Sequence, residues 1–167
     1  MMDTEYSVTA QSYYMGDIAA EALRTSLVKH LAPYGYYVDV QASLMVLPQE
    51  RFRFYITCLP ASKDGLPENT VQDLERAITS VRAAIREVSA KHVSAGDLKA
   101  WKAAYMDRTK DFMSAPEGAV TALEARYAFG KDISKYQESI NSITPENLRS
   151  LLKALSSGGR IEFIANE

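Results

Sequence analysis

Imidazole side chains are the first place to look for chemistry in this sequence, because histidine is a common protein ligand of a catalytic zinc ion. The chain has only two histidines, His30 and His92. Neither lies in an HxxEH or HxxxH pattern, which would place two imidazoles on one face of a helix. We therefore expect both histidines to be solvated or capping residues, and we expect no zinc in this chain.

Other residue types that could do chemistry give no stronger pattern. The GxSxG, GxGxxG and Walker sequences, which serve nucleophilic catalysis and phosphate binding, do not occur. The carboxylate pairs Glu68 with Asp73 and Glu117 with Glu124 have no partner that would shift their pKa values, so surface charge is the simpler interpretation. Cys58 is the only cysteine, and its place on the apolar face of a strand predicts a small buried thiol.

Composition excludes several classes of partner. The chain carries 19 basic and 21 acidic residues, a net charge of −2, without any block of like charge, so we expect no nucleic acid partner. No run approaches the ~18 apolar residues of a membrane-spanning helix, so we expect no membrane partner. The acidic start is unlike a signal peptide, and the pair Met1-Met2 indicates an expression start inside a longer protein. The compartment, whether bacterial periplasm or cytoplasm, is therefore open.

The elements that must position any site are clearest in residues 35–59, where two period-2 patterns flank a short loop that contains Pro48. The apolar face of these two arms consists of Tyr36, Val38, Val40, Ala42, Leu44, Phe52, Phe54, Ile56 and Cys58. The polar face consists of Tyr37, Asp39, Gln41, Ser43, Arg51, Arg53, Tyr55 and Thr57. Such alternation is typical of an antiparallel sheet with one buried face, so we predict a β-hairpin covered by helices on its apolar side only. The phase also argues against an RNA-binding sheet, which stacks its aromatic residues on the open face.

Outside the hairpin, apolar residues recur at helical spacings in six segments. We predict helices over residues 13–31, 67–91, 94–112, 114–129 and 132–141, and from 144 to the break at Gly158. Ser94 with Asp97 is expected to form a capping box, and Ser114 with Glu117 is expected to form another cap. Short strands are expected at 4–10, with Tyr6 and Val8 on one side, and at 160–164. With right-handed crossovers this order predicts an α+β fold, an α/β sandwich with a ferredoxin-like split βαβ antiparallel sheet and one face covered by several helices. Residues 1–167 would form a single domain, part of a larger protein.

The order of these parts resembles one domain of the pitrilysin/insulinase family of zinc metallopeptidases. The resemblance rests on the strand GYYVDV, the proline-bearing loop LPQERFRFYI, the phrase VSAGDLKAWKAAY and the segment YAFGKDISKYQESINSITPENLRSLLKAL, over roughly residues 15–164. It implies a clam-shell of α/β domains in which one half holds zinc through HxxEH and the other half closes over a peptide substrate. Because this chain lacks HxxEH, it resembles a domain of the half without metal, with zinc only in a companion domain.

The same resemblance implies a substrate-binding pair, an Arg followed seven residues later by a Tyr. The tyrosine corresponds to Tyr37 by its distance from Gly35 and by its phase on the polar face, or to Tyr36 if the register slips by one. The sequence departs from the pattern at the arginine. Lys29 stands seven residues before Tyr36, and His30 stands seven before Tyr37.

Two further alignments of the arginine are less favourable. Aligning the helix ends puts Ala32 at that position, and Arg24 lies farther upstream. The expected substrate-binding residues are therefore Tyr37, Tyr36 and Lys29, with no catalytic residue in this chain.

Three functions stay open at this point. The first is a catalytically inactive domain of such a peptidase, which lines a peptide chamber together with companion metallopeptidase domains. The second is a free-standing module that captures a peptide or protein on a sheet edge or on the polar face. The third is a subunit of a hetero-oligomeric peptidase whose partner chain supplies zinc.

Overall fold

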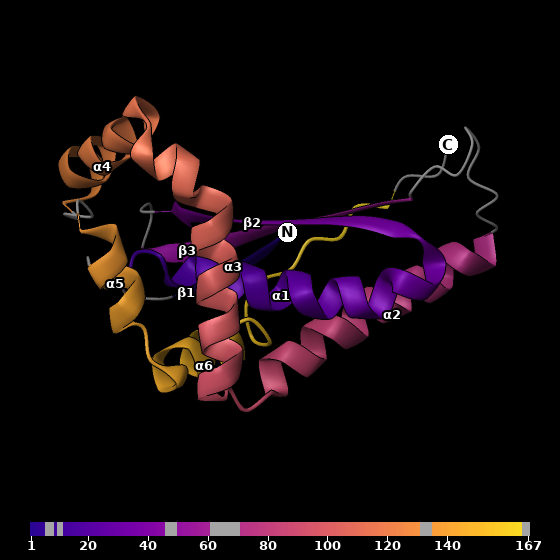
Figure 1. Cartoon of the computed structure of the whole chain (residues 1–167). Helices are drawn as coiled ribbons and strands as arrows, with labels where there is room; N and C mark the ends of the chain where they lie inside the picture. Colours follow the sequence, from indigo (N-terminus) through magenta and orange to yellow (C-terminus); the bar gives the residue numbers. More distant parts are fainter. Residues whose placement is uncertain (6–8, 10–11, 46–49, 61–70, 131–134, 165–167) are drawn as a thin grey trace.

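The computed structural model describes residues 1–5, 9, 12–45, 50–60, 71–130 and 135–164. Its sheet has three antiparallel strands, β1 (Met2–Glu5), β2 (Tyr36–Met45) and β3 (Arg51–Pro60), in the spatial order β1-β3-β2. The predicted hairpin is confirmed, with Val40 opposite Ile56 in the β2–β3 register. Because β3 pairs with β1 on its other side, β2 lies at an edge of the sheet (Figure 1).

The two short strands differ from the prediction. β1 begins at Met2 and ends at Glu5, while Tyr6 and Val8 lie outside the described residues. The expected closing strand at 160–164 is reduced to a single bridge between Arg160 and Met2. Residues 160–164 run antiparallel to the first residues of β1. Beside the bridge, the Ile161 amide donates a hydrogen bond to the Met1 carbonyl at 3.0 Å. Within the described residues, the sheet therefore keeps the split arrangement, with β3 between β1 and β2, and its fourth strand is reduced to the bridge at Arg160.

The helices follow the apolar spacings closely. They are α1 (Met15–Leu31), α2 (Val71–Ala90), α3 (Ala95–Ser114), α4 (Pro116–Phe129), α5 (Tyr136–Ser142) and α6 (Pro145–Ala154). A 3-10 turn, η1 (Ala32–Tyr34), joins α1 to β2, and Gly35 takes a positive φ of 66° there. The residues 61–70 and 131–134, where two predicted helices were to begin, lie outside the described residues.

The helix caps show where short-range signals work and where they fail. Ser94 and Asp97 form the predicted capping box at the start of α3, with Ser94 Oγ accepting from the Asp97 amide at 3.0 Å. The cap expected from Ser114 at the start of α4 is wrong. Helix α3 continues through Ser114, whose hydroxyl donates to the Lys110 carbonyl at 2.8 Å, and Ala115 occupies the N-cap position instead.

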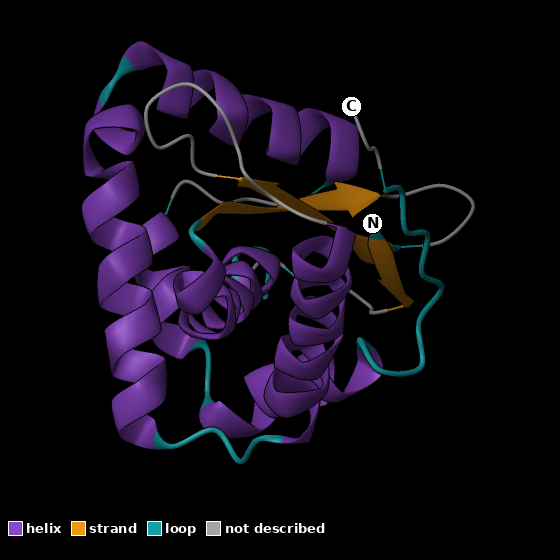
Figure 2. Ribbon diagram, turned by 90° about the vertical axis from the view of Figure 1, so that its right-hand side faces the viewer, coloured by secondary structure: helices purple, strands orange, loops and turns teal. Residues whose placement is uncertain are grey.

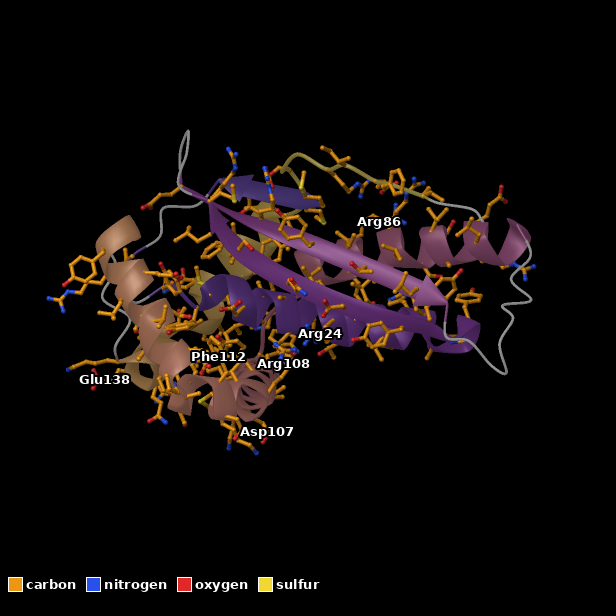
Figure 3. The ribbon with its side chains drawn as sticks, turned by 90° about the horizontal axis from the view of Figure 1, so that it is seen from above. Arg24, Arg86, Asp107, Arg108, Phe112 and Glu138 are labelled. Atoms are coloured by element: carbon orange, nitrogen blue, oxygen red, sulfur yellow. The ribbon has the colours of Figure 1, made fainter. Side chains whose placement is uncertain are left out.

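The core lies between the apolar face of the hairpin and the helices. Helix α1 is its centre, since it contacts β2, α2, α3 and α6 and buries residues on every side, including Ile18, Leu23, Leu27 and Leu31. Helix α2 packs alongside α1 on the same side of the sheet, and α3 stands upright past the edge strand β2 (Figures 1 and 2). The opposite face of the sheet is left uncovered (Figure 3). The α+β fold with one covered face is thus confirmed.

Among the described residues no helix is both long and apolar enough to cross a lipid bilayer.

The two faces of the hairpin differ in exposure. Two valines (38 and 40) and two phenylalanines (52 and 54) are buried on the covered face of the hairpin, whereas Tyr37 is 62% exposed on the other. The predicted assignment of the two faces is therefore confirmed.

The first turn of α1 offers a test of this packing. A Cβ added at Gly16 would lie 2.5 Å from Cδ1 of Phe52, a ring that is almost fully buried. We expect Gly16→Ala to lower the free energy of unfolding by about 1–3 kcal/mol, because the overpacked ring must shift. Urea unfolding measures this change.

Gly96 provides the matched control, because it is also the second residue of a helix. A Cβ there meets only Ser94 Oγ, at 3.7 Å, so Gly96→Ala should leave stability unchanged or raise it by about 0.4–1 kcal/mol. Equal effects of the two substitutions would contradict the close packing of α1 on β3.

Candidate functional site

A groove of about 680 Å³ runs along the free edge of β2, and Tyr37, one of the predicted site residues, lines it. Helix α1 contributes to its floor, while α3 and the start of α4 form the opposite wall. Figure 3 shows α3 beside the edge of β2, with Arg24, Arg108 and Phe112 in the space between them. A smaller pocket of about 280 Å³, which extends towards Leu44 and Phe52, shares Tyr13, Asp17 and Ala42 with the groove. The two cavities therefore form one elongated depression.

The backbone of β2 can be oriented from a single contact. Arg24 Nη2 donates to the Val40 carbonyl at 2.6 Å, so this carbonyl points away from β3 and into the groove. In an antiparallel strand the N–H and C=O groups of one residue point to the same side, and the side alternates along the strand. The backbone groups of Val38, Val40 and Ala42 therefore face the groove, while those of Asp39 and Gln41 pair with β3.

An ionic network crosses the floor of the groove. Glu21, only 5% exposed, accepts from Arg24 Nη1 at 3.2 Å and also pairs with Arg108 of α3. Arg24 Nη2 lies 3.3 Å from Asp39 Oδ1 on β2. Burial raises the pKa of Glu21, and the charge of Arg24 opposes that rise. The network fixes α3 and β2 to opposite sides of α1 and so sets the width of the groove.

Among the carboxyl groups that line the groove, Asp17 has the most strongly perturbed pKa. Its carboxylate accepts a hydrogen bond from the Tyr105 hydroxyl at 3.2 Å. Desolvation by the surrounding protein raises the pKa of Asp17 to about 7, the nearby charge of Glu21 adds to the rise, and the Tyr105 hydrogen bond counteracts it. No ion pair with Asp17 occurs among the described residues. A carboxylate that titrates near neutral pH in a cleft is typical of functional sites.

The structure separates the three residues predicted to bind substrate. Tyr37 lines the groove from the outer end of β2. Tyr36 is half-buried on the opposite face, where it packs against the core. Lys29 is exposed near the end of α1, where its Nζ lies 3.6 Å from Glu87 of α2, and it does not line the groove. Lys29 and Tyr37 therefore do not share a cleft.

The residues weighed for metal or thiol chemistry lie elsewhere. His30 Nε2 lies 2.5 Å from Glu87 Oε2, and His92 is exposed just after α2. Within the described ranges, no group of three or more His, Cys, Asp or Glu side chains is close enough to hold a metal ion. Cys58 is half-buried, and desolvation raises the pKa of its thiol, which disfavours the thiolate.

Asp17 and Glu21 on α1 are not predicted as site residues from the sequence, and Arg24 is set aside there because it lies farther upstream. Asp17, Glu21 and Arg24 follow one another at steps of four and three along α1, a helix that is otherwise largely buried. Charged residues on one stripe of a buried helix are a signal that could have revealed the site, because a buried charge needs a partner or a function. Their partners on α3, Tyr105 and Arg108, could not be found by spacing alone.

Comparison with known proteins supports the fold rather than an activity. No protein-family model and no curated protein sequence matches the chain. Among solved structures it is similar to a mutant of the ferredoxin protease FusC, determined in complex with Arabidopsis ferredoxin. The similarity has a TM-score of 0.61 and 18% sequence identity, and it covers 92% of this chain but 16% of the FusC chain. At this identity the match shows that the fold is shared, and this chain spans about one sixth of the length of that protease.

The raised pKa of Asp17 predicts a pH-dependent stability. The pKa of Asp17 is about 7 in the folded protein and about 4 in the unfolded chain. The folded protein therefore loses stability as the pH rises from about 4 to about 7, because the unfolded chain gives up this proton more easily. Asp17→Asn removes this pH-dependent loss of stability, because asparagine has no carboxyl group to ionise. After allowance for solvent screening, we expect the stability of the variant relative to the unsubstituted protein to increase by about 1–2 kcal/mol between pH 5 and pH 8. Urea unfolding at the two pH values measures it.

Asp107→Asn is the matched control, since Asp107 is an exposed residue on the outer side of α3 that pairs with Lys110. Its substitution should leave the difference in stability independent of pH over this range. If Asp17→Asn behaved in the same way, the carboxyl group would not be desolvated in the folded protein.

Proposed function

We propose that this chain is a catalytically inactive domain of a pitrilysin/insulinase-like zinc peptidase, and that it helps to form the peptide-binding chamber opposite the zinc-bearing half. The observation that carries the proposal is the likeness to a protease over 92% of this chain, combined with a groove along the edge strand β2. The match covers 16% of the FusC chain, which supports the proposal that this chain is one domain of a larger protein. The peptidase activity, its substrates and the companion domains belong to the proposal.

An extended peptide would add to the free edge of β2 as a further strand. The backbone groups of Val38 and Ala42 face the groove and would supply the main-chain hydrogen bonds, which give affinity without selecting a sequence. Between them, the Val40 carbonyl already accepts a hydrogen bond from Arg24. This bond would either persist beside the bound peptide or break to let the peptide pair with Val40. Side chains of the peptide would alternate between the open face and the wall formed by α3.

Tyr37 is the residue that we propose to act on the substrate. Its exposed side chain lies at the end of the groove, where its hydroxyl could donate a hydrogen bond to a carbonyl oxygen that gains negative charge. Such a bond contributes roughly 3 kcal/mol where water is excluded. Arg24 is a better basic partner for Tyr37 than Lys29, because Arg24 lines the same groove.

Zinc would come from a companion domain. The described residues offer no cluster of metal ligands, and the two histidines lie on separate elements, so the donor set in this part of the chain does not fit a catalytic zinc ion. The contribution of this chain would be to bind and orient the peptide and to present the Tyr37 hydroxyl to its carbonyl oxygen.

A free-standing peptide- or protein-interaction module is the alternative, because the same groove would serve it equally well. A third possibility is a subunit of a hetero-oligomeric peptidase. A longer reading frame with an HxxEH domain supports the first function, and a neighbouring frame with HxxEH supports the subunit. A short frame without such a neighbour supports the free-standing module.

Peptide hydrolysis tests the proposal. We expect the chain alone to hydrolyse no peptide and to bind no stoichiometric zinc, and we expect hydrolysis from the intact protein that includes the HxxEH domain. In that protein, Tyr37→Phe should lower kcat roughly a hundredfold, because one oxyanion donor is lost. Turnover of a fluorogenic peptide measures both effects.

Tyr55→Phe is the matched control, because Tyr55 lies on the same open face of the sheet, on the neighbouring strand β3. Its substitution should leave kcat unchanged. Unchanged turnover for Tyr37→Phe would make Tyr37 an ordinary strand residue, and zinc bound by His30 or His92 in the isolated chain would overturn the inactive role.

A further inference from the structure

We propose that the groove contains a subsite for a basic side chain of the bound peptide, formed by Asp17 together with Tyr13, Tyr14 and Tyr105. This inference rests on the proposed binding of an extended peptide along β2. It goes beyond that proposal because it names the chemical class of one residue of the peptide, lysine or arginine, and the residues that select it.

Charge is the first argument. The two arginines of the groove are already neutralised, since Glu21 pairs with Arg24 and with Arg108, and Asp39 lies 3.3 Å from Arg24. Asp17 is different, because the hydrogen bond from Tyr105 is its one side-chain hydrogen bond among the described residues. A desolvated carboxylate without a basic partner carries an energetic cost, which a cationic ligand would offset.

The aromatic surroundings are the second argument. The rings of Tyr13 and Tyr14 meet edge to face with centroids 5.2 Å apart, and the rings of Tyr14 and Tyr105 lie 6.2 Å apart. All three tyrosines line the groove beside Asp17. Tyrosine faces attract ammonium and guanidinium groups, and this attraction strengthens where water is excluded. One carboxylate within a group of tyrosines therefore fits a basic side chain better than an acidic or a neutral one.

The position of Asp17 is the third argument. It lines both the main groove and the smaller pocket, so it lies where the two cavities meet. Ala42 lines both cavities too, and its backbone groups face the groove. A peptide paired with Ala42 would direct every second side chain towards the helices below the edge. The alanine side chain leaves space for a long side chain to pass from the sheet edge down to Asp17.

Binding of a cation should be linked to the protonation of Asp17. Its pKa of about 7 means that the carboxyl group is about half protonated at neutral pH. The titratable groups that act on it are Glu21 on α1, Tyr13 and Tyr14 before α1, and Tyr105 on α3. One step farther away, Arg108 of α3 pairs with Glu21, Glu124 of α4 lies near Tyr13, and Tyr136 of α5 lies near Tyr14. The pKa values of the tyrosines near Asp17 (residues 13, 14 and 105) are raised, mainly by burial, so they stay neutral between pH 6 and pH 8. Glu21 keeps its two arginine partners, which favour its charged form, so Asp17 would be the group that responds over this range.

Two short peptides test the subsite. Both are acetylated, amidated peptides of alternating Val and Ser; one has a central Lys, and its twin has norleucine, which keeps the four side-chain carbons of lysine and lacks the ammonium group. We expect the unsubstituted chain to bind the Lys peptide at least tenfold more tightly than the norleucine peptide at pH 8, measured by isothermal titration calorimetry. The affinity for the Lys peptide should fall about tenfold from pH 8 to pH 6, as the ionised fraction of Asp17 falls from about 0.9 to 0.1.

Asp17→Asn should abolish both the preference for Lys and its pH dependence, whereas Asp107→Asn, on the outer side of α3, should keep them. Circular dichroism checks that each variant is folded, and the comparison of the two peptides on the unsubstituted chain does not depend on a variant. Equal affinity for the two peptides would overturn the subsite and leave the peptide groove intact. If neither peptide bound, the proposed strand addition along β2 would fail and the subsite with it.

Discussion

The enclosure of helix α1 is the constraint on which the rest of the structure depends. This helix contacts β2, α2, α3 and α6, and leucine and isoleucine side chains along its length are fully buried. A helix buried on so many sides has little room for charged residues, yet α1 carries Asp17, Glu21 and Arg24 on one stripe. These three side chains point to the one side where α1 meets the groove between β2 and α3. The polar site is therefore a consequence of how the core is closed.

Glu21 holds that arrangement together. It lies between Arg24, which reaches the carbonyl of Val40 on the edge strand, and Arg108, which projects from α3. A buried carboxylate is stable only when it is paired, so both arginines are held close to α1. The spacing between β2 and α3 is fixed as a result, and the edge of the sheet stays accessible. Asp17 shares the same floor without sharing the ion pairs, which makes it available for a ligand.

Much of the fold follows from local patterns in the sequence. The alternation in residues 36–58 predicts the hairpin and its two faces, and Ser94 with Asp97 predicts the start of α3. Both predictions are accurate because the alternation along a strand and the capping of a helix depend on residues close together in the sequence. Predictions at the ends of the sheet were less accurate. The pairing of β1 with β3 and the single bridge at Arg160 depend on how distant segments meet, which apolar spacing does not encode.

The site was less predictable than the fold. Tyr37 was placed on the open face by its phase, but Lys29 was chosen from its distance along the sequence and lies beside Glu87, outside the groove. Arg24 stands farther from Tyr37 in sequence and nevertheless lines the same cleft, since α1 runs antiparallel beneath β2. Contacts between α1 and α3, such as that of Asp17 with Tyr105, join residues far apart in the chain and become visible only in three dimensions.

The central claim is that an extended peptide pairs with the free edge of β2, and amide hydrogen exchange measured by NMR tests it most directly. The amides of Val38, Val40 and Ala42 face the groove, whereas those of Asp39 and Gln41 already pair with β3. Addition of the Lys peptide should slow exchange at one or more of the first three at least tenfold and leave the other two nearly unchanged. Unaltered exchange at all three groove-facing amides, under conditions where the peptide is bound, would contradict the account.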